Sequence, residues 1–323
     1  MSQVKIHTKS EVDDALLTVG IPFTKGKLQR GGGLRLTFNG RELPLWWEER
    51  AHWPDGSIKW IFLHTRVPAG GKELILRTTD AETDSRTSKQ VKFVNGELQL
   101  EDVVLEISEE DWTFKASSGS WELVQDITVS EPKLELKRTP WEIELVETSP
   151  IAPLIRLKPE QAKEGLLIDQ FLRLDPLGKR LIWQRRMTWH KPGKYFLLSA
   201  KASLIPGQIP DEEGSLLIPE PGKVSYNSAS AIEDYPEGRW DGRDHSLWVE
   251  KAWQRSPLEI AWNKSGVDLC FYPDKVKTLP VLGGTSFRHT VHLTCGENAS
   301  DTAGHQVEFT LDPVHVCQSE ALG

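Results

Sequence analysis

The chain has 323 residues, of which 38% are hydrophobic and 27% are charged. These fractions are ordinary for a globular protein, and they exclude a disordered chain, a collagen-like fibre and a bundle of membrane helices. The formal net charge of −8 argues against nucleic acid or an anionic membrane surface as the main partner.

The cysteine pattern and the N-terminal segment bear on the compartment. Cys270, Cys295 and Cys317 are odd in number and widely spaced, and no CxxC motif occurs, which is typical of reduced thiols rather than of a disulfide framework. The N-terminal segment is polar and charged, unlike a signal peptide, and no apolar run approaches the ~18 residues of a membrane helix. We therefore expect a cytoplasmic protein that does not cross a membrane.

Short alternating apolar runs, separated by Gly, Pro, Asn and Asp, follow one another along the chain and predict an all-β fold. The clearest runs lie at 34–38, 59–63, 73–77, 103–107, 142–145, 168–174, 181–190, 195–204, 267–272, 288–294 and 306–311. A turn or two of helix is expected only at 10–17 and 159–165. Two segments interrupt the pattern: the polar stretch 78–90 predicts a domain boundary, and 206–230 predicts a long loop within the second domain.

Two motifs stand in the first eighty residues. Residues 18–26 read TVGIPFTKG and residues 53–60 read WPDGSIKW. Asp55-Gly56 predicts a tight hairpin turn, because glycine accepts a positive φ without steric cost, and this hairpin would pair Trp53 with Trp60 across its strands. Asp55 and Gly56 are thus explained by the turn, and the tryptophans by packing.

These two motifs, in this order, resemble the N-terminal RIFT-barrel domain of the family that includes exo-rhamnogalacturonan lyases and YetA-like proteins. Residues 149–157 (SPIAPLIRL), 253–258 (WQRSPL) and 282–293 are similar to the family's central β-sandwich. Together with the polar boundary, the resemblance implies a RIFT-like barrel at 1–80, a linker at 81–90, a large antiparallel β-sandwich at 91–316 and a tail at 317–323. It covers two of the three family domains, since an α/α toroid follows the sandwich in the family.

The resemblance implies β-elimination on a uronate-containing saccharide. Such a reaction needs a base, a cation that neutralises the carboxylate, and an acid for the leaving oxygen. Two alternatives stay open. The chain is a non-catalytic carbohydrate-binding or assembly module, with a separately encoded toroid subunit as its partner, or it is an enzyme of different chemistry that uses the cleft between barrel and sandwich.

The densest supply of suitable groups lies at residues 235–248, which read YPEGRWDGRDHSLW. Gly238 and Gly242 predict a loop. Within it, we expect proton transfer by Tyr235 or His245, a carboxylate clamp by Arg239 or Arg243, and a sugar platform at Trp240. The alternative is a solvated loop whose acids and arginines pair with one another.

A second candidate is the strand at 181–190. Alternation places Leu181, Trp183, Arg185, Met187 and Trp189 on one face and Ile182, Gln184, Arg186, Thr188 and His190 on the other. The second face suits a ligand, and we single out Gln184, Arg186 and His190 as substrate-binding residues, with a plain solvent-facing strand as the alternative.

No metal or cofactor site is predicted. His289 and His292 are three residues apart, so in a strand they lie on opposite faces, and no HExxH motif, EF-hand loop or Cys/His cluster occurs. Calcium held by scattered Asp and Glu oxygens stays open.

Overall fold

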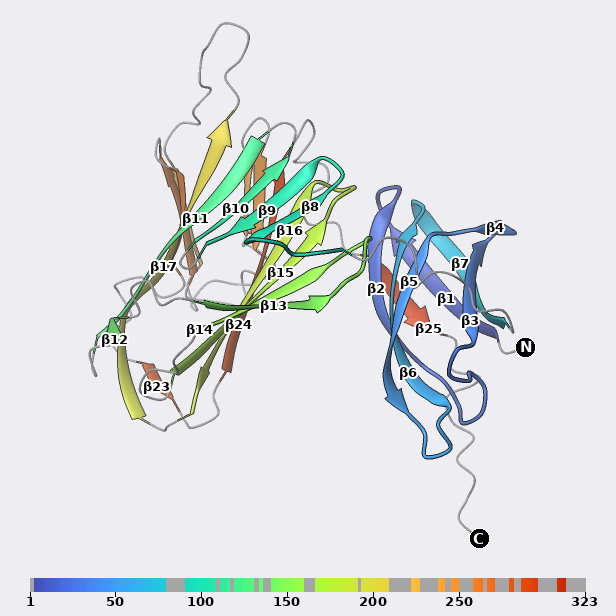
Figure 1. The fold of residues 1–323 in the computed structure, drawn as a ribbon. Coiled ribbons are helices and arrows are strands. Elements are labelled where there is room, and N and C mark those ends of the chain that lie inside the picture. The colour runs from blue at the N-terminus through green and yellow to red at the C-terminus, as the bar shows by residue number, and fades with distance from the viewer. Residues whose placement is uncertain are drawn as a thin grey trace, which may run out of the picture. The chain divides into compact units, whose positions relative to one another are not determined.

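The computed structural model describes residues 3–79, 91–108, 111–116, 119–130, 134–135, 141–159, 166–190, 193–208, 222–226, 238–241, 245–249, 258–263, 266–270, 279–281, 286–295 and 307–311. The regular elements in these ranges are β-strands (Figure 1), so the predicted all-β class is confirmed. The helical turn expected at 10–17 is wrong, because the chain only turns at 11–14. There the Ser10 hydroxyl accepts a 3.2 Å hydrogen bond from the Val12 amide, and a strand begins at Ala15.

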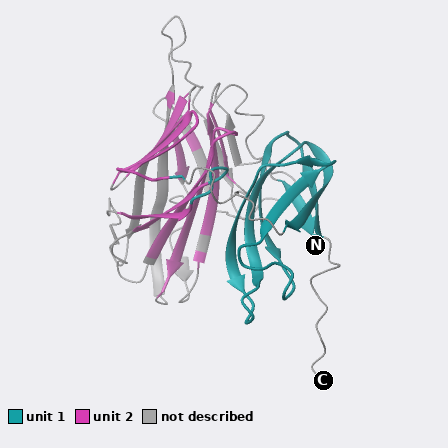
Figure 2. Cartoon of the chain, turned by 45° about the vertical axis from the view of Figure 1, so that its right-hand side comes forward, with its two compact units in different colours: residues 1–91, 148–152, 305–323 teal, residues 92–147, 153–304 magenta. Residues whose placement is uncertain are grey.

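The chain forms two compact units (Figure 2). The first comprises residues 1–91, 148–152 and 305–323, and the second comprises 92–147 and 153–304. The predicted linker 81–90 and tail 317–323 lie outside the described residues. The predicted sandwich extended to 316, whereas residues 307–311 lie in the first unit.

Two antiparallel sheets build the first unit. One has the order β25-β1-β7-β3-β4 and the other β2-β6-β5. Their strands are β25 (Glu308–Leu311), β1 (Gln3–Ser10), β7 (Gly70–Thr79), β3 (Gly33–Phe38), β4 (Arg41–Glu42), β2 (Ala15–Pro22), β6 (Ile58–Val67) and β5 (Leu45–His52). The sheets share one apolar core because their strands alternate: in β2, Ala15, Leu17, Val19 and Ile21 are buried and the residues between them are only partly so.

The predicted hairpin at Asp55-Gly56 joins β5 to β6. Gly56 has φ +85°, and the Asp55 carboxylate accepts hydrogen bonds from the Ser57 amide at 3.0 Å and the Ser57 hydroxyl at 2.6 Å. The expected pairing of Trp53 with Trp60 is wrong. A bulge shifts the register so that Trp60 lies opposite Ala51, while the Trp53 indole donates to the Phe23 carbonyl at 3.0 Å.

The second unit contains a ten-stranded and a seven-stranded sheet. The first has the order β18-β21-β22-β17-β11-β10-β9-β8, with β12 beside β11 and β23 beside β17. Its strands are β18 (Gly222–Tyr226), β21 (Leu258–Asn263), β22 (Gly266–Cys270), β17 (Gly193–Gln208), β11 (Gly119–Ser130), β10 (Trp112–Ala116), β9 (Val103–Ile107), β8 (Glu97–Leu100), β12 (Leu134–Glu135) and β23 (Leu279–Val281). The predicted loop at 206–230 thus contains strand β18.

The seven-stranded sheet has the order β13-β14-β15-β16-β24-β20-β19. Its strands are β13 (Trp141–Glu147), β14 (Leu154–Pro159), β15 (Leu166–Asp175), β16 (Arg180–Trp189), β24 (Ser286–Cys295), β20 (His245–Val249) and β19 (Gly238–Asp241). The two sheets pack face to face through tryptophans: the Trp112 and Trp183 rings lie 5.8 Å apart, and the Trp121 indole donates to the Thr294 carbonyl at 3.0 Å. This is the β-sandwich that the sequence predicts.

Candidate functional site

Strand β16 gives the seven-stranded sheet two different faces. The predicted alternation of its two faces is confirmed. Buried residues are Leu181, Trp183, Arg185, Met187 and Trp189, and partly buried residues are Ile182, Gln184, Arg186 and Thr188. We call the first face, which packs on the ten-stranded sheet, the inner face, and the second the outer face. Polar side chains gather on the outer face.

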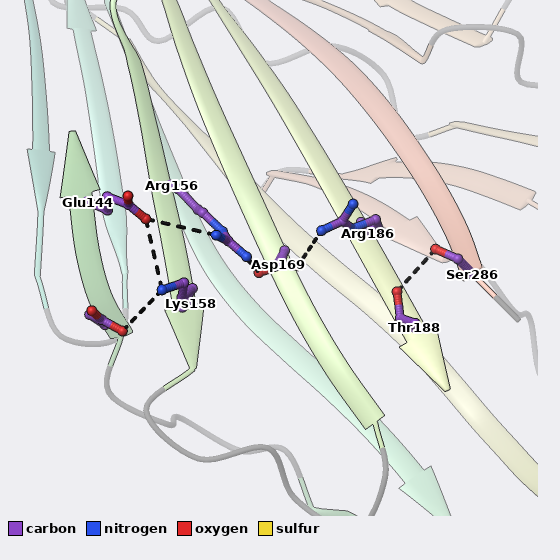
Figure 3. Close-up of polar contacts among 8 residues, drawn as sticks. Glu144, Arg156, Lys158, Asp169, Arg186, Thr188 and Ser286 are labelled. Atoms are coloured by element: carbon purple, nitrogen blue, oxygen red, sulfur yellow. Dashed lines mark hydrogen bonds and ion pairs between the residues drawn. The ribbon is translucent and has the colours of Figure 1, made fainter. Parts of the chain in front are cut away.

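A shared carboxylate lies at the centre of the outer face (Figure 3). The side chain of Asp169 on β15 is 1% exposed and lies between two guanidinium groups. Arg156 donates to Oδ1 from Nη2 at 2.8 Å and from Nε at 3.2 Å, and Arg186 donates to Oδ2 from Nη2 at 2.7 Å. Such charge-assisted hydrogen bonds are shorter and stronger than neutral ones, so they hold both arginines in place.

The electrostatics of Asp169 follow from these neighbours. Burial by itself raises the pKa of the Asp169 carboxyl, but the hydrogen bonds and positive charges of Arg186 and Arg156 outweigh it and hold the pKa below the ordinary value of 3.8. Asp169 is therefore ionised at neutral pH. It serves as a fixed counter-charge rather than as an acid.

A third arginine stands beside this group. Arg288 on β24 lies directly opposite Arg186, which in turn lies directly opposite Asp169. We call the three arginines, Arg156, Arg186 and Arg288, the arginine row. Arg288 is exposed, and its side chain makes no ion pair or hydrogen bond within the part of the chain that the structure describes. Like charges directly opposite each other across strands repel, so an anion bound between Arg186 and Arg288 would be stabilised.

Hydrogen-bonding groups flank the arginine row. On one side the Gln184 amide donates to the Thr290 hydroxyl at 3.4 Å, and on the other the Thr188 and Ser286 hydroxyls lie 3.2 Å apart (Figure 3). The ring of Phe171 lies beneath the arginines, with its centroid 5.6 Å from Cζ of Arg156 and 5.8 Å from Cζ of Arg186. This combination of charge, hydroxyls and a ring suits a polyhydroxylated anion.

Acidic residues lie between the arginine row and the edge of the sheet. Glu144 on β13 lies 3.9 Å from both Arg156 and Lys158, and Glu142 lies 3.5 Å from Lys158. These groups leave the edge close to neutral, because each cation there has an acidic partner. Among the described cations named here, Arg288 is the one for which no acidic partner is seen.

The predicted loop at 235–248 forms the other end of the same sheet. Tyr235 and Arg243 lie outside the described residues. Arg239 and Trp240 are in strand β19, where the backbone pairs residue 239 with Trp248 and residue 240 with Leu247. A hairpin therefore replaces the expected continuous loop, and both predicted sites belong to one sheet. Strand β20, which holds His245, is two strand spacings or about 10 Å from β16, and β19 is three spacings or about 14 Å away.

His245 lies on the inner face, not on the outer one. Its ring is 5.4 Å from that of Trp121, and Nε2 is 3.1 Å from the Ser120 carbonyl oxygen. The residue is 2% exposed, and the strand phase directs 245, 247 and 249 toward the opposite sheet. This environment gives His245 a packing role in the sandwich.

The remaining histidines occupy separate positions. His190 is exposed and follows the end of β16, beyond the arginine row. His289 and His292 lie on opposite faces, as predicted: His289 opposes Arg185, while His292 opposes Ile182. The His292 ring contacts the Trp248 ring, with centroids 4.6 Å apart and the planes tilted by 47°. Among the described residues, no group of three or more His, Cys, Asp or Glu side chains could hold a metal ion. No described helix is long and apolar enough to cross a membrane.

Three residues of the outer face were missed by the sequence analysis: Arg156, Asp169 and Arg288. Asp169 carried a detectable signal, since a carboxylate inside the apolar run 166–174 is costly to bury without a cationic partner. Which cation would supply that partner could not be read from the local pattern.

Comparison with a known family supports the first unit's fold. Residues 4–72 match the model of the PcRGLX-like N-terminal RIFT barrel domain, so the predicted RIFT barrel is confirmed. An α-mannosidase from Enterococcus faecalis V583 aligns over 95% of this chain and 46% of its own, with 10% identity and a TM-score of 0.47. A Glycosyl Hydrolase Family 38 protein from Enterococcus faecalis aligns over 95% and 47%, with 8% identity and a TM-score of 0.46.

The chain thus spans less than half the length of these two structures. Their identities and TM-scores are too low for a functional inference. No curated protein matches the chain. The family match covers residues 4–72, within the first unit, alone.

Proposed function

We propose that this chain recognises an acidic saccharide and that the outer face of the seven-stranded sheet binds its uronate carboxylate. The observation that carries the proposal is the arginine row, in which Arg288 faces Arg186 while Asp169 is already shared between Arg156 and Arg186. The match of residues 4–72 to a rhamnogalacturonan-lyase-like family supports a saccharide as the ligand.

The charges of the outer face favour an anion. Around the arginine row, Asp169, Glu142 and Glu144 supply three negative charges, while Arg156, Lys158, Arg186 and Arg288 supply four positive ones, which leaves one positive charge in excess among these residues. The other described ion pairs of this face, Arg173–Glu147 and Arg180–Asp175, are neutral. A carboxylate between Arg186 and Arg288 would accept charge-assisted hydrogen bonds from both. The amide of Gln184 and the hydroxyl groups of Thr188 and Ser286 would meet the sugar hydroxyls on either side.

Catalysis by β-elimination is the finer form of this proposal. Two arginines on a uronate carboxylate would also acidify the neighbouring C–H, as a lyase requires. The base would then be Tyr235 and a further neutralising cation Arg239 or Arg243. Because Tyr235 and Arg243 lie outside the described residues, binding is the function that the described geometry supports best.

One pair of assays separates the two forms. Calorimetric titration of the whole chain with oligogalacturonates and rhamnogalacturonan oligosaccharides measures binding, and the absorbance of unsaturated uronate products measures elimination. Binding with no absorbance change indicates a recognition module, and an absorbance increase indicates a lyase. If no acidic saccharide binds, the proposal is wrong.

A further inference from the structure

The N-terminal unit has an exposed aromatic ring that the proposed function does not use. Trp60 on β6 is 40% exposed and lies on the face of the sheet β2-β6-β5 that points away from the apolar core. Ile61, the next residue along β6, is fully buried, so the two-residue strand period directs the Trp60 indole outward. A register irregularity between Trp60 and Ile58 allows Ile58 to be buried as well. An exposed tryptophan is uncommon, because its ring is the largest apolar surface of any side chain.

Gly20 makes room for this indole. A Cβ at position 20 would lie 2.6 Å from Cζ2, 2.8 Å from Nε1 and 2.9 Å from Cε2 of Trp60. The backbone of Gly20 lies in the middle of strand β2 and does not have a positive φ, so its conformation does not require glycine. The missing side chain is explained by the ring above it. The Trp60 indole therefore lies over Gly20 on β2, and 40% of the residue is left exposed.

Polar groups lie within one sugar width of the ring. Phe62 is two residues along β6, about 7 Å away, and lies opposite Glu48. The Arg50 guanidinium lies over the Phe62 ring at 5.3 Å and pairs with Glu48 at 2.8 Å, and both charged side chains are about one-third exposed, at 34% and 29%. A pyranose stacked on Trp60 would bring its hydroxyls to this ion pair, which both donates and accepts hydrogen bonds.

The surface patch formed by Trp60, Phe62, Glu48 and Arg50 is small, and its two charges cancel. Among the described residues of this unit, the exposed large apolar side chains are Trp60 and Phe309, and they belong to different sheets. A protein interface needs a contiguous patch of several hundred square ångströms, whereas one ring suffices for one sugar. The Glu48–Arg50 pair has no net charge, in contrast to the arginine row, so a neutral sugar fits better than a uronate.

We infer that Trp60 is a stacking platform for a neutral pyranose residue of the saccharide. The apolar C–H face of the sugar would lie on the free side of the indole. The inference rests on the proposed function in taking a saccharide as the ligand, but it concerns a different unit, a different sugar and different residues.

The test uses the whole chain with ¹⁵N-labelled tryptophan indoles. The Trp60→Phe variant identifies the Trp60 signal among the thirteen by its disappearance. Titration with methyl α-galactopyranoside is expected to shift the Trp60 signal, and Trp60→Ala is expected to weaken binding by about tenfold. Gly20→Ala should weaken it too, because it displaces the ring, whereas Phe309→Ala should not. An unmoved Trp60 signal, or equal binding by wild type and Trp60→Ala, would overturn the inference.

A second arm separates this inference from the proposed function. The uronate analogue, methyl α-galactopyranosiduronate, differs from the galactoside only at C6, and Arg288→Gln should weaken its binding without changing the Trp60 response to the galactoside. A Trp60 response combined with no effect of Arg288→Gln on uronate binding would leave the platform standing and contradict the arginine row. Weaker uronate binding by Arg288→Gln, combined with no Trp60 response to the galactoside, would contradict the platform alone.

Discussion

The inner and outer faces of the seven-stranded sheet differ although the same strands build both. On β16, Trp183 and Met187 point inward and are 1% exposed, while Arg186 between them points outward and holds a carboxylate. The two-residue period of a strand thus lets one segment supply the sandwich core and the candidate site independently. Changes on the inner face should alter stability, and changes at the rim of the outer face should alter ligand binding.

The largest effect is expected on the inner face. Replacing Trp183 by Ala removes a buried ring that packs on Trp112 and leaves a cavity between the sheets, so the free energy of unfolding should fall by about 3–5 kcal/mol. Chemical denaturation measures this loss. Thr188→Ala, on the other face of the same strand, is the control and should change it by less than about 0.5 kcal/mol. Similar losses of unfolding free energy for both variants would contradict the difference between the inner and outer faces.

The centre of the outer face should also matter for stability, but less. Asp169→Asn leaves Arg156 and Arg186 facing each other without their shared carboxylate, and we expect a loss of about 2–3 kcal/mol, since Arg186 is partly exposed. Because the folded-state pKa of Asp169 is lowered, its contribution is present above pH 3.8 and is lost as the pH falls through the folded pKa. Unfolding midpoints of both proteins should therefore converge in acid, and a constant difference would contradict the ion-pair account.

The buried His292 should make the stability of the protein depend on pH. Burial, followed by the charge of Arg180, holds the pKa of His292 well below its ordinary value of 6.5. The unfolded chain then binds a proton that the folded chain does not, so stability should fall by up to about 1.4 kcal/mol per pH unit below 6.5. His292→Phe should flatten this slope between pH 6.5 and 5. An unchanged slope would mean that the ring is protonated in the folded protein.

The smallest effect on stability is expected at Arg288. Arg288→Gln removes a charge that lies opposite Arg186, so the free energy of unfolding should stay within about 0.5 kcal/mol or rise slightly. Thermal unfolding at low and high salt would show this, because salt screens the same repulsion. A loss above about 1 kcal/mol would indicate a structural role and remove Arg288 from the candidate site.

The sequence predicted local features well, since these depend on near neighbours. The alternation of β16 and the Asp55-Gly56 turn were predicted because strand period and turn chemistry act over a few residues. The arginine row was not, because Arg186 and Arg288 meet only through the register of strands that are far apart in sequence. His245 shows the same limit: Gly238 and Gly242 suggested a loop, and only the pairing of β20 with β24 fixes its inward phase.

The most direct test of the central claim is the affinity of two matched variants for an oligogalacturonate, measured by calorimetry. Arg288→Gln and Lys115→Gln each remove one positive charge from the second unit, but Lys115 lies on the other sheet and pairs with Glu106. The account predicts that Arg288→Gln weakens binding by about tenfold or more, the equivalent of one charge-assisted hydrogen bond, while Lys115→Gln binds like wild type. Equal affinities for both variants would contradict it.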